Sequence, residues 1–310
     1  ADLVADQPGD RADAEGQAIE QRVEHARVAA QLADALLAPG QVVDLFVGGM
    51  FHCAAHLRQQ FVGPEAAAQR DARAHRAQRV SSLFQLDGGI AQLDGAKEVQ
   101  PHAPAPHRLL AANVIAFDKS EPRTRAYDVL RNHLLGLVKA DIPQVVAVTA
   151  PTPGCGVTVT CANLAFSIAR ARKQTIVVID LKPKAKAGGL AEVLSLPRVK
   201  AAADSTIVDR VRRVRAGGAV VNMLTPPDNA DIPAFVDMVK RDLRPDVLLL
   251  DTPPLLVGDE AAQILPVADL VLLVVAVGQS SVSELETCKS FLPAGAKLQV
   301  LMNKARPHGM

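Results

Sequence analysis

Residues 145–160 read VVAVTAPTPGCGVTVT and combine a strand, a glycine-rich loop and the start of a helix. Its first part, Val145–Thr149, has the length and the branched side chains of a buried strand. A loop with two glycines, Gly154 and Gly156, follows and leads into a segment with helical spacing from Thr158 to Arg172. A strand, a glycine-rich loop and a helix in this order are typical of phosphate-binding units.

The sequence after residue 120 continues this alternation of strand-length apolar runs with helix-length segments. Apolar runs lie at Thr175–Asp180, Ala219–Leu224, Val247–Asp251, Leu270–Val277 and Leu298–Asn303, and helical segments at Pro233–Asp242, Glu260–Leu265 and Val282–Phe291. Near-continuous Val, Leu and Ile predict strands buried on both faces, as in a parallel sheet covered by helices. We therefore expect an α/β domain with a doubly wound, mostly parallel sheet over residues 120–306.

The loop has most of the groups that a phosphate-binding loop needs. Its glycines let backbone N–H groups surround phosphate oxygens, the helix N-terminus favours anions, and the Thr158 hydroxyl suits Mg²⁺. The lysine that reaches the β- and γ-phosphates is absent, because Val157 stands in its place. Taken alone, the loop fits an ordinary strand–turn–helix connection as well as it fits a nucleotide site.

Two apolar runs end in an acidic residue. Asp180 closes TIVVID and Asp251 closes VLLLD. Parallel sheets bind ligands beyond the carboxyl ends of their strands, and a buried carboxylate needs a metal, a water or a donor there. Beside the glycine-rich loop, the two acids predict an Mg²⁺–nucleotide site. The structural alternative is that each aspartate caps the segment that follows it.

Several motifs together resemble those of the bacterial tyrosine kinases of capsule and exopolysaccharide synthesis. TAPTPGCGVTVTCANLA is similar to the family loop T-S-P-x-P-G-E-G-K-S/T-T followed by A-A-N-L-A. VVIDLKPK is similar to L-I-D-A-D-L-R-R-P, LDTPP to I-I-D-T-P-P, and VLMNKA to the final strand G-V-V-L-N-K. The resemblance covers about residues 119–306 and implies a P-loop NTPase fold of the ParA/MinD type.

The resemblance also implies a set of ligands and partners. It implies ATP and Mg²⁺ as cofactors, with catalytic roles for Asp180 and Asp251 and Mg²⁺ coordination by Thr158 and Asp251. The nucleotide-binding positions that it implies are Gly154, Cys155, Gly156, Val157, Thr158, Val159 and Asn303. The implied partner is a membrane polysaccharide co-polymerase on a separate polypeptide. A homo-oligomer and a peripheral place at the inner face of the membrane are implied as well.

The sequence departs from the family pattern at positions that serve catalysis. Val157 replaces the phosphate-binding lysine, and Lys182 replaces the second acid of L-I-D-A-D. Residues 305–310 contain no tyrosine, whereas the family is phosphorylated on a tyrosine-rich tail. We therefore expect a catalytically impaired protein that acts as a regulator or partner.

The family's assembly motif E-x-x-R-x-x-R is altered too. Its positions read Arg125, Asp128 and Arg131, so the acid is lost and the middle charge is reversed.

Two alternatives remain open. The first is an active tyrosine kinase or ATPase in which Lys182 or Lys184 replaces the missing lysine. The second is a positioning ATPase of the ParA/MinD type, whose signature lysine would stand where this chain has Thr152.

Composition and charge argue against nucleic-acid binding, zinc sites and a disulfide framework. The 310 residues carry a net charge of +1 and only 3% aromatic residues, which predicts no nucleic-acid partner. The basic run Arg210–Arg215 is interpreted as a solvated helix face. The four cysteines form no C-x-x-C pair, which predicts neither a zinc site nor a disulfide framework and favours the cytoplasm.

Residues 1–108 differ in character from the rest. Lys97 is the only lysine before Lys119, and the Ala-, Gln-, His- and Arg-rich text shows no sustained period. We expect a poorly ordered extension, with a segment that is not a natural coding region and a small partner-binding helical domain as alternatives. A linker over 109–119, the domain over 120–306 and a short tail over 307–310 complete the expected organisation.

Overall fold

The computed structural model describes residues 44–47, 50–53, 100–137, 143–171, 174–182, 189–196, 205–293 and 297–304. The strands are β1 (Asp44–Val47), β2 (Met50–Cys53), β3 (Gln144–Thr149), β4 (Ile176–Asp180), β5 (Arg212–Ala216), β6 (Ala219–Leu224), β7 (Val247–Asp251), β8 (Leu270–Ala276) and β9 (Lys297–Asn303). The helices are α4 (Pro106–Ala111), α5 (Thr124–Leu137), α6 (Val157–Ala171), α7 (Leu190–Val193), α8 (Ile207–Arg210), α9 (Ile232–Leu243), α10 (Glu260–Ile264), the 3₁₀ turn η1 (Leu265–Val267) and α11 (Val282–Lys289).

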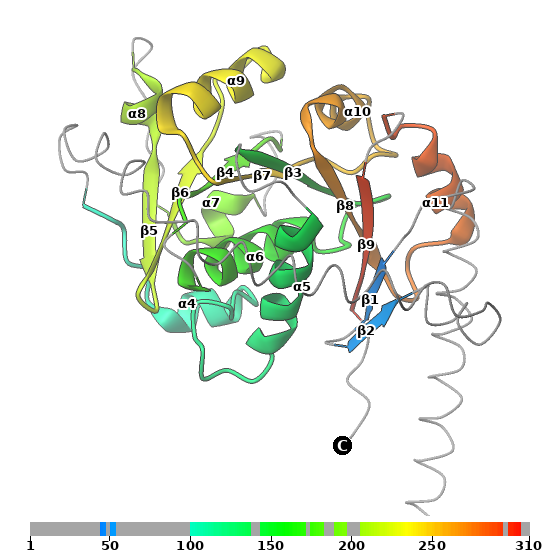
Figure 1. Ribbon diagram of the computed structural model, residues 1–310, viewed down its shortest axis with the longest axis horizontal. Coiled ribbons are helices and arrows are strands. Elements are labelled where there is room, and N and C mark those ends of the chain that lie inside the picture. Colours follow the sequence, from blue (N-terminus) through cyan, green and yellow to red (C-terminus); the bar gives the residue numbers. More distant parts are fainter. Residues whose placement is uncertain are drawn as a thin grey trace, which may run out of the picture.

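The strands form one sheet in the order β2-β1-β9-β8-β3-β7-β4-β6-β5 (Figure 1). In this spatial order, the seven strands β1, β9, β8, β3, β7, β4 and β6 run parallel to their neighbours within the set. Only the outermost pairs, β2 with β1 and β5 with β6, are antiparallel. The strand β3, which precedes the glycine-rich loop, lies between β7 and β8 at the centre of the sheet. The loop therefore opens at the middle of the carboxyl edge.

Helices cover both faces of the sheet, as the continuous apolar runs predict. Successive residues of one strand belong to different cores: Val146 and Val148 pack with α4 to α7, and Val145 and Ala147 pack with α8 to α11. Figure 1 shows α5 and α6 on one side of the sheet and α9 to α11 on the other. This alternation follows from the two-residue period of a strand. The doubly wound α/β fold expected from the sequence is confirmed.

The basic run Arg210–Arg215 is not a helix face, and that prediction is wrong. Residues 212–216 form the edge strand β5, which pairs antiparallel with β6. Gly217 and Gly218 join the two strands with φ angles of 55° and 82°, the left-handed backbone that a two-residue hairpin requires. Val214 is fully buried between its arginine neighbours, so the alternation has the period of a strand rather than of a helix.

Residues 109–119, expected to be a linker, pack into the core. Leu109, Val114 and Ala116 are fully buried, and Phe117 contacts the Phe166 ring edge to face with centroids 6.2 Å apart. Just before this segment, the backbone of His102 exchanges hydrogen bonds with Arg213 and Arg215 on β5. The ordered domain thus begins before residue 109, because apolar side chains in this stretch cover the α6 face of the sheet.

The strands β1 and β2 fall inside the segment 1–108. β1 pairs parallel with β9 and extends the sheet at that edge. The expected tail 307–310 lies outside the described residues. Within the described part of the chain, no helix has the length and apolarity needed to cross a membrane.

Candidate nucleotide-binding site

The glycine-rich loop joins β3 to α6, and its backbone depends on two glycines. Gly154 and Gly156 adopt φ angles of 84° and 98°, which side chains disfavour. A Cβ atom at Gly156 would lie 2.3 Å from Asn303 Nδ2. That same amide nitrogen donates to the Cys155 carbonyl at 2.8 Å. The predicted residue Asn303 thus supports the loop from the end of β9, and Gly156 allows the close approach.

Two further residues, neither of them predicted from the sequence, contact the loop. Gln279 Nε2 donates to the Pro153 carbonyl at 3.0 Å, and the Ser280 hydroxyl lies 3.6 Å from Cys155 Sγ. Both follow β8 in a turn that contains Gly278, whose φ of 74° favours glycine. A glycine directly after an apolar run was the signal for this turn.

Cys155, Val157 and Val159 offer the loop no charged group. Cys155 is 1% exposed, and burial of this kind opposes thiol reactivity. Val157 is 5% exposed and packs in the core between the sheet and α6, so the side chain at the lysine position belongs to the packing. Val159 is half-buried, and its carbonyl accepts a hydrogen bond from Asn163 Nδ2 at 2.9 Å.

Thr158, Asp251 and Lys182 meet beside the loop. Asp251 ends β7 and is fully buried, and Thr158 in the first turn of α6 is 5% exposed. The ammonium of Lys182, just past β4, lies 3.0 Å from Asp251 Oδ1 and donates to Thr158 Oγ1. The structure therefore brings together the two predicted metal ligands and places a lysine nitrogen against both.

Burial dominates the electrostatics of Asp251. It raises the pKa of this carboxyl to about 6, against the opposing effect of the Lys182 ammonium, and the charge of Asp180 adds to the rise. Neither carboxylate oxygen has a well-oriented hydrogen bond from the described residues. A buried acid that lacks such donors stabilises a fold poorly, which favours a functional role.

Asp180 is paired with Asp251 in the β4–β7 register but has a different environment. Its Oδ1 accepts from the Lys182 backbone N–H at 3.2 Å, and its Oδ2 from the Leu190 N–H at 3.1 Å. Burial raises the pKa of this carboxyl, and these two backbone donors lower it. Asp180 thus connects the end of β4 to the start of α7, which is the capping role that the sequence left open.

A magnesium ion does not fit this arrangement as it stands. Thr158 Oγ1 and Asp251 supply oxygens of the kind that Mg²⁺ binds. The Lys182 ammonium, however, contacts both of them and carries a positive charge of its own. Lys184, the other lysine considered for the phosphates, lies outside the described residues.

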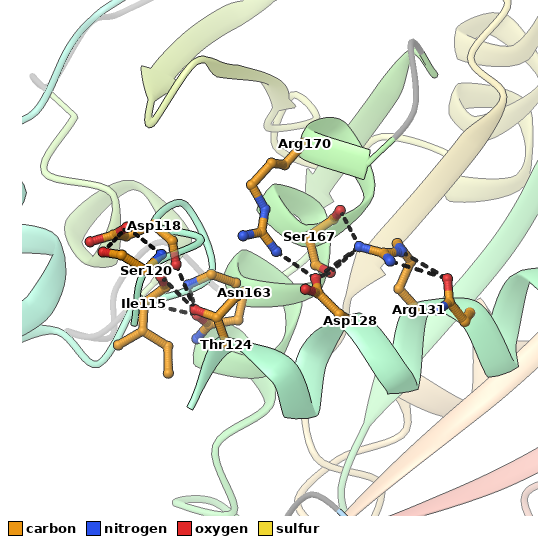
Figure 2. A network of polar contacts seen from close by, with 11 residues as sticks. Ile115, Asp118, Ser120, Thr124, Asp128, Arg131, Asn163, Ser167 and Arg170 are labelled. Atoms are coloured by element: carbon orange, nitrogen blue, oxygen red, sulfur yellow. Dashed lines mark hydrogen bonds and ion pairs between the residues drawn. The ribbon is translucent and has the colours of Figure 1, made fainter. Parts of the chain in front are cut away.

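The altered assembly motif forms contacts within the chain (Figure 2). Asp128 Oδ1 on α5 accepts from Arg131 Nη1 at 2.8 Å, from the Ser167 hydroxyl at 2.7 Å and from the Arg170 guanidinium. Arg131 is 8% exposed and also donates to the Ser167 carbonyl at 2.9 Å. The reversed charge at position 128 therefore fastens α5 to α6.

Replacing Asp128 with asparagine should lower the free energy of unfolding by about 1–3 kcal/mol, because two guanidinium groups lose their shared carboxylate. Urea denaturation at neutral pH measures the change. Asp242→Asn is the matched control, since Asp242 pairs with Arg241 at the surface and its loss should have a smaller effect. Equal losses in the two variants would contradict the special role of Asp128.

The chain is similar in sequence to one tyrosine-protein kinase and in fold to solved structures. No protein-family model matches the sequence. The tyrosine-protein kinase CpsD of Streptococcus pneumoniae serotype 4 is 26% identical over 180 residues, which are 54% of this chain and 78% of that protein. The chimerical protein CapA2B2 has a TM-score of 0.52 at 21% identity, over 63% of this chain and 91% of its own.

A second solved structure has the same fold. The kinase domain of the Escherichia coli tyrosine kinase ETK has a TM-score of 0.51 at 19% identity, over 69% of this chain and 88% of its own. The P-loop NTPase fold that the family resemblance implies is thereby confirmed.

Proposed function

We propose that this bacterial tyrosine kinase-like P-loop domain is a catalytically impaired nucleotide-binding protein of capsule or exopolysaccharide synthesis. One observation carries the proposal: Gly154 and Gly156 have the left-handed backbone that suits a phosphate-binding loop, while the side chain at the lysine position, Val157, is packed in the core. The domain then retains a place for phosphates and lacks the charge that would stabilise their transfer.

A second observation argues against phosphorylation at Tyr127. Tyr127 is the single tyrosine of the sequence, and it lies half-buried on α5. Burial raises the pKa of its hydroxyl to about 12. Phosphorylation would place a dianion where the ring now packs against the core.

The partner that suits such a domain is a membrane polysaccharide co-polymerase. The support is the similarity to the tyrosine-protein kinase CpsD. Through this partner, the domain would work at the inner face of the membrane. We do not propose self-assembly through residues 125–131, because Asp128 and Arg131 bind each other and Arg131 binds the Ser167 carbonyl on α6.

Restoring the missing lysine tests the proposal. Val157→Lys should tighten ATP binding by about 10-fold to 100-fold in isothermal titration, since a charge-assisted contact contributes about 1.5–3 kcal/mol. Val157→Met, which adds length without charge, is the matched control and should gain nothing. Two results would contradict the proposal: ATP binding by neither the parent nor Val157→Lys, or tight binding with turnover in the parent.

An active ATPase that uses Lys182 is the second candidate, because the Lys182 ammonium reaches Thr158 at the start of α6. Phosphate release by the parent protein distinguishes the two functions. Turnover that disappears in Lys182→Ala favours the active enzyme, and a parent without turnover removes it.

A further inference from the structure

Lys182 lies where the sequence predicts a metal ion. Its Nζ is in contact with Asp251 Oδ1, at 3.0 Å, and with Thr158 Oγ1. Mg²⁺ would have to bind these same oxygens at about 2.0–2.1 Å. A dication between them would lie against the ammonium, in a setting where Asp251 is fully buried and water screens the repulsion weakly.

We infer that the Lys182 ammonium takes the place of Mg²⁺ in this site, so that the loop binds phosphate without a metal ion. The part that concerns phosphate rests on the proposed function. The part that concerns the metal rests only on the three side chains and is tested separately below.

The chemistry of the ammonium supports this substitution. A lysine ammonium has three N–H donors. Thr158 accepts from one of them, Asp251 lies in ion-pair contact with the ammonium, and a donor remains for a phosphate oxygen at the start of α6. The Lys182 side chain is 23% exposed, so it reaches the buried acid from the solvent side. One group thus places a positive charge beside Asp251 and contacts Thr158, the two residues implied as metal ligands.

Binding of Mn²⁺ alone, followed by electron paramagnetic resonance, tests the metal part. The parent protein should leave the signal of free Mn²⁺ unchanged, whereas Lys182→Asp should reduce it at one site per chain. That site should be lost again when Asp251→Asn is added. Mn²⁺ bound by the parent, or bound by neither protein, would overturn the inference.

Two further variants control for misfolding and for effects outside the site. Lys182→Met answers the same question if Lys182→Asp lacks a cooperative thermal transition. Lys119→Met removes an exposed lysine outside the site and should behave as the parent does.

Titration with ADP tests the phosphate part, in buffer with excess EDTA and in buffer with excess Mg²⁺. The dissociation constant of the parent should agree within about 2-fold between the buffers, and Lys182→Met should bind about 10-fold to 100-fold more weakly in EDTA. A parent that binds about 10-fold more tightly with Mg²⁺ would overturn the inference. Absence of ADP binding in both buffers would contradict the proposed function, and the Mn²⁺ result would still decide the role of Lys182.

Discussion

Replacing Asn163 with alanine should lower the free energy of unfolding by about 4 kcal/mol, because several buried backbone groups lose their partner at once. Asn163 is fully buried on α6. Its Oδ1 accepts from the N–H groups of Ile115 and Ala116 at 2.7 and 2.9 Å. Its Nδ2 donates to the carbonyls of Asn113 and Val159, each at 2.9 Å. Figure 2 shows this side chain beside Ile115 and Thr124.

Urea denaturation monitored by circular dichroism measures this loss. Gln263→Ala is the matched control, since Gln263 is an exposed amide with one hydrogen bond to Asp259, and its change should stay within about 0.5 kcal/mol. A loss below about 1 kcal/mol for Asn163→Ala would show that residues 113–116 are held to α6 by their apolar side chains alone.

Replacing Asp251 with asparagine should make the protein more stable at pH 8 by about 3 kcal/mol. Burial raises the pKa of Asp251 to about 6 in the folded protein, above the value of about 3.9 for an exposed carboxyl. The folded state therefore holds a proton that the unfolded state releases between these two values. Parent stability falls as the pH rises through this window, and the neutral amide avoids that loss.

The pH dependence separates this effect from a change in packing. The difference between Asp251→Asn and the parent should be largest above pH 6 and should nearly vanish at about pH 4. Asp237→Asn on the exposed face of α9 is the control, and its effect should stay within about 0.5 kcal/mol at every pH. A destabilised Asp251→Asn at pH 8 would show that the ion pair with Lys182 outweighs the burial of the charge.

A stabilising substitution at a fully buried position would mark Asp251 as a residue kept for function. The Val157, Lys182 and Asp251 variants together measure phosphate binding, metal binding and stability separately.

Most of the fold could be predicted because its signals are local. Continuous apolar runs such as Val247–Asp251 indicate strands buried on both faces, and the glycines at 154 and 156 indicate the loop. Short helices and strands were harder to predict from the sequence. The strand β5 was mistaken for a helix face because a run of arginines suggests solvent, while its antiparallel partner β6 determines its conformation.

The boundary of the domain could not be found from composition. Residues 109–119 have no strong period, yet Leu109, Val114 and Phe117 fill the core beside α6. Their role depends on Asn163, which lies far along the chain and binds the backbone at 115 and 116. Hydrogen bonds of this kind leave no periodic pattern in the sequence.

Residue type and local spacing are enough to predict the α/β fold, the position of the glycine-rich loop and the loss of its lysine. They do not show that Val157 is packed in the core, that Asp180 accepts from backbone N–H groups, or that the Lys182 ammonium lies between Thr158 and Asp251. These contacts depend on β4, β7 and α6, which meet only after the parallel strands pair. The pairing register of strands that are distant in sequence then determines which groups lie close to each buried charge.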